Sequence, residues 1–260
     1  MSGKSKSWRR LGLVALALVV VGSVGAVAVM WNQSMRVLAK YHEVRLDPTH
    51  AERFIPDNAS LAPPAAGQPR IVLMGDSRLD EWSEPAISVE AQIVNRAQSG
   101  DTTGQVLLRL DRDVIALSPR VVVLQVGIND LQAIGMLPDG ARAIRERTIA
   151  NLRSMVQRLR AADIHVLITS IFPVGPIPVI REPVWSDETL QAVDATNEAL
   201  RELEGPGVTY LDCDELFRVD GRMDPRFAAD EFHLTDAAYG VLGEALTAAL
   251  RQILDADAVQ

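Results

Sequence analysis

The chain has 260 residues, 48% of them hydrophobic, which is enough apolar material for one mid-sized domain with a sizeable core. The net charge is −8, and the four positive charges of residues 1–10, which include no acidic residue, leave −12 on the remainder. This acidic balance argues against nucleic acid as a partner, because phosphate binding needs basic patches. Cys213 is the only cysteine, which excludes an intrachain disulfide and a cysteine-based metal site.

Residues 11–31 form an apolar run without a charged residue. A run of this length can cross a hydrocarbon layer of roughly 30 Å as one helix. Positive flanks tend to stay in the cytoplasm, so we expect residues 1–10 to be a cytoplasmic basic tail, residues 11–31 a transmembrane signal anchor, and the rest to lie outside. The alternative is a cleaved signal peptide and a secreted protein, because Ala26-Val27-Ala28 offers a small-residue cleavage pattern.

Residues 32–69 are predicted to be a stalk between the membrane segment and a folded domain. Residues 32–46 are expected to continue the membrane helix for a short distance. Residues 47–70 are rich in proline, alanine and polar residues, which favours an extended spacer. The folded domain is then expected over residues 70–255.

Within that domain, short β-branched runs alternate with longer amphipathic stretches. The short runs lack polar alternation, which is typical of strands buried on both faces, and lie at 71–74, 91–94, 121–126, 164–169 and 208–211. The longer stretches repeat apolar residues at helical spacing and lie at 106–115, 144–159, 190–203 and 235–253. The alternation predicts an α/β fold, a three-layer α/β/α sandwich with a central five-stranded parallel sheet of flavodoxin-like winding.

Polar clusters follow the first three predicted strands and precede the last helix. They are Gly75-Asp76-Ser77, residues 95–101, Gly127 to Asp130, and Asp230 to His233. Ligands bind beyond the carboxyl ends of the strands in such a sheet, so we expect these clusters to converge on one edge. Together they supply a hydroxyl, oxyanion donors, a carboxylate and an imidazole, which is the set that acyl transfer needs.

The physical roles follow from position. Ser77 lies at a predicted strand-to-helix turn, where backbone N–H groups are unpaired, but its hydroxyl needs a base. His233 is the candidate at the correct edge, and Asp230, three residues earlier, can bond its other ring nitrogen and fix the tautomer. Asn129 offers a side-chain N–H₂ group as an oxyanion donor.

The four clusters resemble, in the same order, the sequence blocks of the SGNH hydrolases, also called the GDSL family. The resemblance runs from about residue 70 to residue 254. It implies an SGNH hydrolase domain that needs no cofactor, with a catalytic triad and an oxyanion hole. The implied triad is Ser77, Asp230 and His233, and the implied oxyanion donors are Ser77, Gly100 and Asn129. Arg78 departs from the family pattern, which often has an apolar residue there.

Simpler roles are open for several of these residues. Ser77 is also a favoured helix cap, Gly100 a turn glycine and Asn129 a loop residue. Asp76 and Asp130 are expected to order their loops. The remaining histidines, His42, His50 and His165, are scattered, so no metal site is expected.

The proline-rich stretch 170–181 emerges at the same predicted edge. We interpret it as a pocket wall, with Val174, Ile177 and Trp185 as candidate acyl contacts. The alternative is a rigid loop packed against the body of the domain.

The resulting hypothesis is a membrane-anchored, extracytoplasmic ester hydrolase that forms an acyl-serine intermediate. Its expected substrates are small-molecule, glycan or lipid esters, either acetyl or short-acyl esters of glycans or lipid esters. Two alternatives stay open. The first is an O-acyltransferase with the same triad, and the second is a catalytically silent domain that binds envelope polymers.

Overall fold

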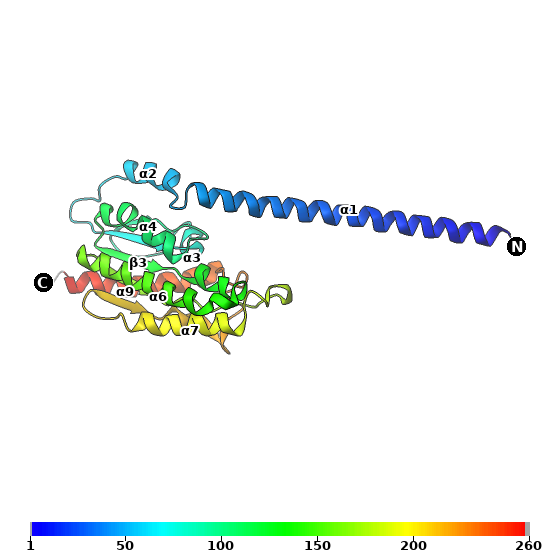
Figure 1. Cartoon of the computed structure of the whole chain (residues 1–260). Coiled ribbons are helices and arrows are strands. Elements are labelled where there is room, and N and C mark those ends of the chain that lie inside the picture. The colour runs from blue at the N-terminus through cyan, green and yellow to red at the C-terminus, as the bar shows by residue number, and fades with distance from the viewer. Residues whose placement is uncertain (1, 258–260) are drawn as a thin grey trace. The chain divides into compact units, whose positions relative to one another are not determined.

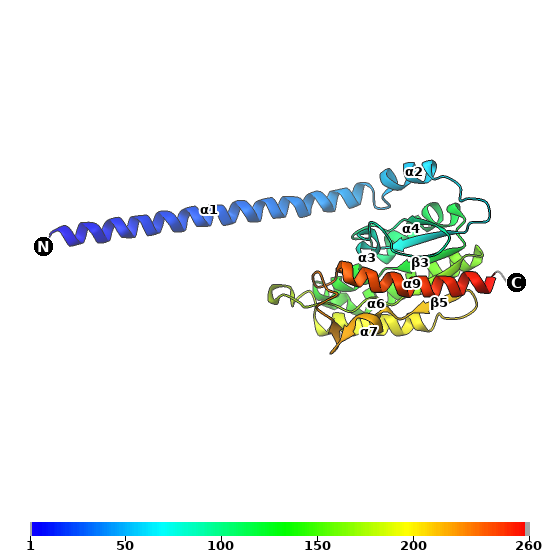
Figure 2. The same ribbon diagram turned by 180° about the vertical axis from the view of Figure 1, so that it is seen from behind.

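The computed structural model describes residues 2–257, with side chains for residues 12–256. Five parallel strands form one sheet in the order β2-β1-β3-β4-β5, labelled in part in Figures 1 and 2. The strands are β1 (Arg70–Gly75), β2 (Gln92–Asn95), β3 (Val121–Gln125), β4 (His165–Thr169) and β5 (Val208–Leu211). Their order reverses between β1 and β3, so the loops after these strands open at the carboxyl edge of the sheet.

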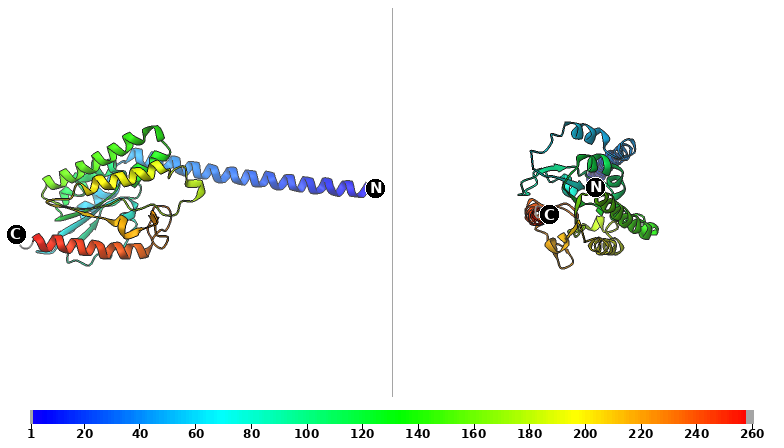
Figure 3. Two further views of the ribbon diagram at one scale, coloured as in Figure 1. Left: turned by 90° about the horizontal axis from the view of Figure 1, so that it is seen from below. Right: turned by 90° about the vertical axis from the view of Figure 1, so that its left-hand side faces the viewer.

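Helices cover both faces of this sheet. One face packs against α4 (Thr103–Asp113), α6 (Ala141–Ala161) and α7 (Asp187–Arg201), and the other packs against α9 (Asp236–Asp257). The left view of Figure 3 shows the sheet between α9, in red, and the pair α6 and α7, in green and yellow. The predicted three-layer α/β/α sandwich is therefore confirmed.

Successive side chains of a strand point to opposite faces of the sheet, so each strand contributes to both cores. In β1, Ile71 and Leu73 belong to the core beneath α9, whereas Val72 and Met74 belong to the core beneath α4 and α6. All four side chains are fully buried, because the sheet is covered on both faces. This explains why the predicted strands show no polar alternation.

Short elements fill the connections. They are α3 (Ser77–Asp80), η1 (Ile115–Leu117), α5 (Ile128–Leu131), η2 (Gln132–Gly135), η3 (Pro138–Gly140), η4 (Val179–Arg181), α8 (Cys213–Phe217), β6 (Arg218–Val219) and β7 (Arg222–Met223). Most of them lie at the carboxyl edge of the sheet, where they supply the loops that surround the candidate site.

Helix α1 (Ser2–Leu46) belongs to a separate unit, residues 1–51. Residues 12–46 of this helix include an apolar window that is long enough to cross a membrane by length and composition, and none of that window is buried. The predicted membrane segment and the short helix expected after it are thus parts of one continuous helix.

The extended spacer predicted over residues 47–70 is wrong in part. Residues Ala51–Ser60 form helix α2, and the second unit begins at Glu52 rather than at residue 70. The physical reason is Phe54, whose side chain is fully buried beneath the guanidinium groups of Arg53, Arg96 and Arg109. An aromatic ring held in this way anchors the segment to the domain.

Candidate active site

The turn that carries the predicted nucleophile, residues 75–81 and here called the nucleophile turn, begins at the last residue of β1. Asp76 is the N-cap of α3, and its carboxylate accepts the N–H of Arg78 at 3.1 Å. Gly75 lies so close to the Gln125 carbonyl that a Cβ atom would be 2.0 Å from it, so only glycine fits. This tight packing places Ser77 at the first position of the helix, where its N–H has no partner within the helix.

The loop after β2 is tied to the nucleophile turn. The Gln98 N–H donates to the Gly75 carbonyl at 3.0 Å, and the Ser99 N–H donates to the Asp80 carboxylate at 2.8 Å. Gly100 follows with a φ of +85°, a conformation that other residues rarely adopt. The predicted oxyanion residue Gly100 therefore lies in a loop that is hydrogen-bonded to the turn of Ser77.

The loop after β3 joins the same edge through side chains. Asn129 donates from Nδ2 to the Asp101 carbonyl at 2.9 Å, and Gln132 donates to its Oδ1 at 3.1 Å. Asp130 accepts from the N–H of Thr103 at 2.8 Å and from its hydroxyl at 2.7 Å. Asn129 thus lies next to the residue after Gly100, and Asp130 orders the start of α4 as expected of a loop-ordering residue.

The base turn, residues 230–233, is built around one carboxylate. Oδ1 of Asp230 accepts the backbone N–H groups of Phe232 at 2.9 Å and His233 at 2.8 Å, while Oδ2 lies 2.7 Å from His233 Nδ1. Partial burial would raise the pKa of Asp230, but these hydrogen bonds together hold it below its usual value. Gly175 supports the turn from outside, because a Cβ atom there would be 2.4 Å from the Asp230 carbonyl.

The base turn and the nucleophile turn are joined by two side chains. Arg78 donates from Nε to the Phe232 carbonyl at 2.7 Å. Glu81, whose N–H donates to the Ser77 carbonyl one helical turn earlier, places its carboxylate 3.3 Å from His233 Nε2. The two nitrogens of the His233 ring therefore contact two carboxylates, Asp230 through Nδ1 and Glu81 through Nε2.

Sequence reasoning missed Glu81 and left the effect of Arg78 open. Glu81 follows Ser77 by four residues, which is the spacing that brings two side chains to the same face of a helical turn. That spacing was the available signal. The contacts of Arg78 had no sequence signal, because they join it to residues far away along the chain.

Two ionisable groups beside Ser77 are fully buried. Burial raises the pKa of Asp76 to about 6, against the opposing effects of the Arg78 charge and N–H group. Burial also lowers the pKa of Arg78 to about 10, against the favourable charges of Asp76, Tyr239 and Asp230. Oδ2 of Asp76 and Nη2 of Arg78 have no hydrogen-bond partner in the described part of the chain.

The loop after β4 contributes to a small core at the same edge. Val174 and Trp185 are each 3% exposed, and with the half-buried Ile177 they pack in one cluster that also includes Phe232. Ile177 and Trp185 line a cavity of about 510 Å³, whereas Val174 is not among its lining residues. The loop therefore both packs against the base turn and borders a cavity.

His165, the other histidine of the domain, lies away from the candidate site. His165 begins β4 at the amino edge of the sheet, where its Nε2 lies 2.9 Å from the Thr209 hydroxyl of β5. Across residues 2–257, no group of three or more His, Cys, Asp or Glu side chains is placed to hold a metal ion.

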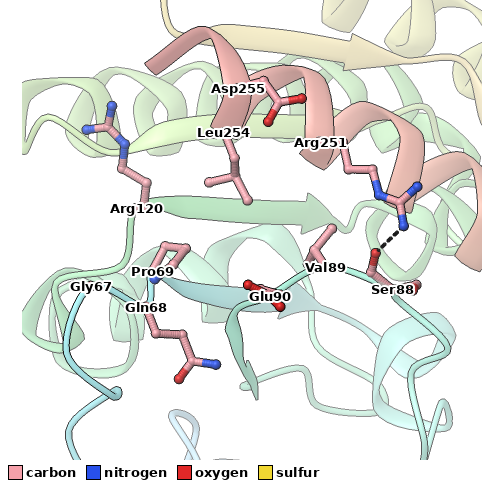
Figure 4. Close-up of a pocket in the computed structure, with 10 residues that line it drawn as sticks. All are labelled: Gly67, Gln68, Pro69, Ser88, Val89, Glu90, Arg120, Arg251, Leu254 and Asp255. Atoms are coloured by element: carbon pink, nitrogen blue, oxygen red, sulfur yellow. Dashed lines mark hydrogen bonds between the residues drawn. The ribbon is translucent and has the colours of Figure 1, made fainter. Parts of the chain in front are cut away.

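A cavity of about 990 Å³ is at the opposite edge and is lined by residues such as Pro69 and Arg120, which precede β1 and β3. Figure 4 shows that Arg251 from α9 reaches across to the Ser88 carbonyl, a bond of 2.8 Å. None of the four clusters lines this cavity. The predicted site residues therefore lie at the carboxyl edge of the sheet, away from this cavity.

Comparisons with known proteins show the family of the chain. The model of the GDSL-like lipase/acylhydrolase family matches residues 67–241. A Bos taurus protein, isoamyl acetate-hydrolyzing esterase 1 homolog, is 28% identical over 195 residues, which cover 64% of this chain and 75% of the relative.

Solved structures give the same result. A GDSL-like lipase from Bacteroides thetaiotaomicron is 25% identical, with a TM-score of 0.66 over 78% of this chain and 98% of its own. An acetylxylan esterase from Geobacillus stearothermophilus is 20% identical, with a TM-score of 0.55 over 71% of this chain and 94% of its own, a likeness of fold. The chain belongs to the GDSL-like lipase/acylhydrolase family, the SGNH hydrolases, and is a hydrolase of ester substrates.

Proposed function

We propose that this hydrolase acts through an acyl-serine intermediate, with Ser77 as nucleophile, His233 as base and Asp230 as the group that orients the base. The observation that carries the proposal is the 2.7 Å contact between Asp230 and His233 Nδ1. It leaves Nε2, the nitrogen that must accept a proton, on the far side of the ring from Asp230 and 3.3 Å from Glu81, the C-cap of the short helix that begins at Ser77. An imidazole oriented by a carboxylate in this way can serve as the base for a serine hydroxyl.

The reaction follows in two balanced halves. Ser77 Oγ attacks the ester carbonyl while its proton passes to His233 Nε2, and the negative oxygen is held by the N–H groups of Ser77 and Gly100 and by the Asn129 amide. His233 then gives that proton to the leaving alcohol as the C–O bond breaks. Water enters, loses a proton to His233 and attacks the acyl-serine, which releases the acid and restores Ser77.

The proposed substrates are acetyl or short-acyl esters of glycans, or lipid esters. The name of the Bos taurus relative includes hydrolysis of isoamyl acetate, an ester of a short acid, which supports a short acyl group here. We further propose that α1 anchors the enzyme in a membrane, with the catalytic domain outside the cytoplasm. Its apolar residues and the basic residues before them support this orientation.

Labelling with a fluorophosphonate probe tests the serine chemistry. The full chain should bind one probe, and Ser77→Ala should abolish both labelling and hydrolysis of p-nitrophenyl esters. A series of p-nitrophenyl esters of increasing acyl length, run beside acetylated glycans, then tests the acyl preference. Unchanged labelling in Ser77→Ala would remove the proposed nucleophile.

Extraction of membranes at alkaline pH tests the anchor. An anchored chain stays with the membrane pellet, and mass spectrometry of that chain finds residues 1–28 intact. Release into the supernatant, or a chain that begins after Ala28, would favour a cleaved signal peptide instead.

A further inference from the structure

Arg78, the residue after the proposed nucleophile, is fully buried, and its guanidinium contacts two loops that are distant in the sequence. Nε donates to the Phe232 carbonyl at 2.7 Å, and Nη1 donates to the Phe172 carbonyl at 3.3 Å. The guanidinium carbon also lies 5.2 Å from the centre of the Phe172 ring. One side chain therefore joins the nucleophile turn both to the loop after β4 and to the base turn.

We propose that Arg78 is a positioning residue, which holds the turn carrying His233 in place against Ser77. This inference rests on the proposed function, because it takes Ser77 as the nucleophile and His233 as the base. Arg78 acts on the reaction through the base turn and contacts neither reacting group through a side-chain hydrogen bond in the described residues.

The Phe232 carbonyl is closely coupled to the imidazole. Phe232 directly precedes His233, and the centres of the two rings are 4.1 Å apart. The N–H groups of both residues bond the same oxygen of Asp230. A shift of this carbonyl therefore moves the ring and its carboxylate partner together, and a misplacement of about 1 Å costs on the order of 10²-fold in rate.

Two further contacts of the base turn lead away from Ser77. The Gly175 N–H donates to the Glu231 carbonyl at 2.8 Å, and Arg181 pairs with the Glu231 carboxylate at 2.8 Å. Both attach the turn to the loop after β4. Glu81 does reach His233 from the nucleophile turn, but its side chain is 46% exposed, and exposed ion pairs are weak. Arg78 is the buried connection between the two turns.

Arginine suits this task because its planar guanidinium carries five donors in a fixed fork and can hold two carbonyls at once. A lysine ammonium is a compact charge and does not match that geometry. Burying a cation is costly, and replacing a whole buried ion pair with apolar groups of similar volume is often neutral or stabilising. Stability alone is therefore a weak reason for a guanidinium at this position.

The test compares Arg78→Lys and Arg78→Gln with Arg70→Lys in the full chain. Arg70 is a matched control, because its guanidinium also bonds two main-chain carbonyls, those of Leu117 and Ala62, but does so at the amino end of β1. Steady-state kinetics with p-nitrophenyl acetate, the rate of fluorophosphonate labelling and the thermal midpoint are measured for each variant.

Both Arg78 variants should lose about 10²-fold in kcat, with KM within about twofold of wild type, and should be labelled more slowly by the same factor. Arg70→Lys should keep the wild-type kcat. The kcat of Arg78→Lys, which retains the charge, should be less than tenfold higher than the kcat of Arg78→Gln, because one ammonium cannot hold both carbonyls.

Three results would overturn the inference. They are a wild-type kcat in a folded Arg78→Lys protein, an effect confined to KM, and loss of folded protein in both Arg78 variants, which would assign the side chain to stability. Failure of the proposed function would look different. In that case the probe would fail to label Ser77 in the wild-type enzyme as well as in every Arg78 variant.

Discussion

His233 Nε2 lies 3.3 Å from the Glu81 carboxylate, while Nδ1 on the other side of the ring lies 2.7 Å from Asp230. The imidazole is thus held between two carboxylates. In the proposed mechanism Nε2 accepts the proton of Ser77, so the contact with Glu81 competes with the contact that this mechanism needs.

Removal of this competitor should favour the productive contact. We expect Glu81→Gln to raise the rate of fluorophosphonate labelling at neutral pH by up to about fivefold, which corresponds to the roughly 1 kcal/mol upper range of an exposed ion pair. Glu84→Gln, a change at an exposed carboxylate in the same loop, serves as the control and should leave the rate unchanged. Slower labelling of Glu81→Gln would show instead that this carboxylate assists the base.

Asp230→Asn separates the orienting role of Asp230 from its role in the turn. The amide oxygen can still accept the N–H groups of Phe232 and His233, but the amide nitrogen cannot accept the proton on His233 Nδ1. We expect kcat to fall about 10⁴-fold, as when a triad imidazole is left in the wrong tautomer, with little change in thermal midpoint. Glu231→Gln should show the reverse pattern, a loss of stability with kcat retained.

Asn129→Ala tests the oxyanion donor. One Nδ2 proton of Asn129 is used on the Asp101 carbonyl, which leaves the other for substrate. We expect kcat to fall by about 10²- to 10³-fold, with a smaller change in KM. Gln132→Ala removes the bond that steadies the Asn129 oxygen and should cost less than tenfold. If Asn129→Ala raises KM and leaves kcat unchanged, the side chain contributes to ground-state binding of the substrate instead.

The sheet and its long helices could be predicted because their signals are local. Each predicted strand ends within one residue of the observed strand, since buried parallel strands are continuous β-branched runs bounded by turns. Helix α2 could not be predicted in this way. It is short, contains Pro56 and is held by contacts of Phe54 with Arg96 and Arg109, which lie about 40 and 55 residues later in the chain.

The four clusters were predicted to converge because parallel strands share one carboxyl edge, and hydrogen bonds between their loops join them there. The roles of Glu81 and Arg78 depend instead on where the base turn lies after folding. A chain position gives no information on a contact between residues 78 and 232. The roles of Glu81 and Arg78 can be recognised only when the contacts of their side chains are known.

Asp76→Asn tests the cost of a buried carboxylate beside the nucleophile. The folded-state pKa of Asp76 is about 6, above its ordinary 3.8, so the folded state favours the protonated form. The contribution of Asp76 to stability is therefore full below pH 3.8 and is lost as the pH rises to about 6. The loss is about 3 kcal/mol by proton linkage. The free energy of unfolding of Asp76→Asn relative to wild type should rise by this amount between pH 4 and pH 7. A difference that does not vary with pH would contradict the burial argument.

Phe54→Ala tests whether the folded domain begins before residue 70. Phe54 is fully buried, and the centre of its ring lies 4.8 Å from the guanidinium carbons of Arg53 and Arg109. Truncation of a buried phenylalanine costs about 3 to 5 kcal/mol, so the midpoint of urea unfolding in detergent should fall markedly. Ile55→Ala is the control, because that side chain is 52% exposed and should cost little. If both variants unfold at the wild-type midpoint, residues 51–60 contribute nothing to the domain and the spacer interpretation is restored.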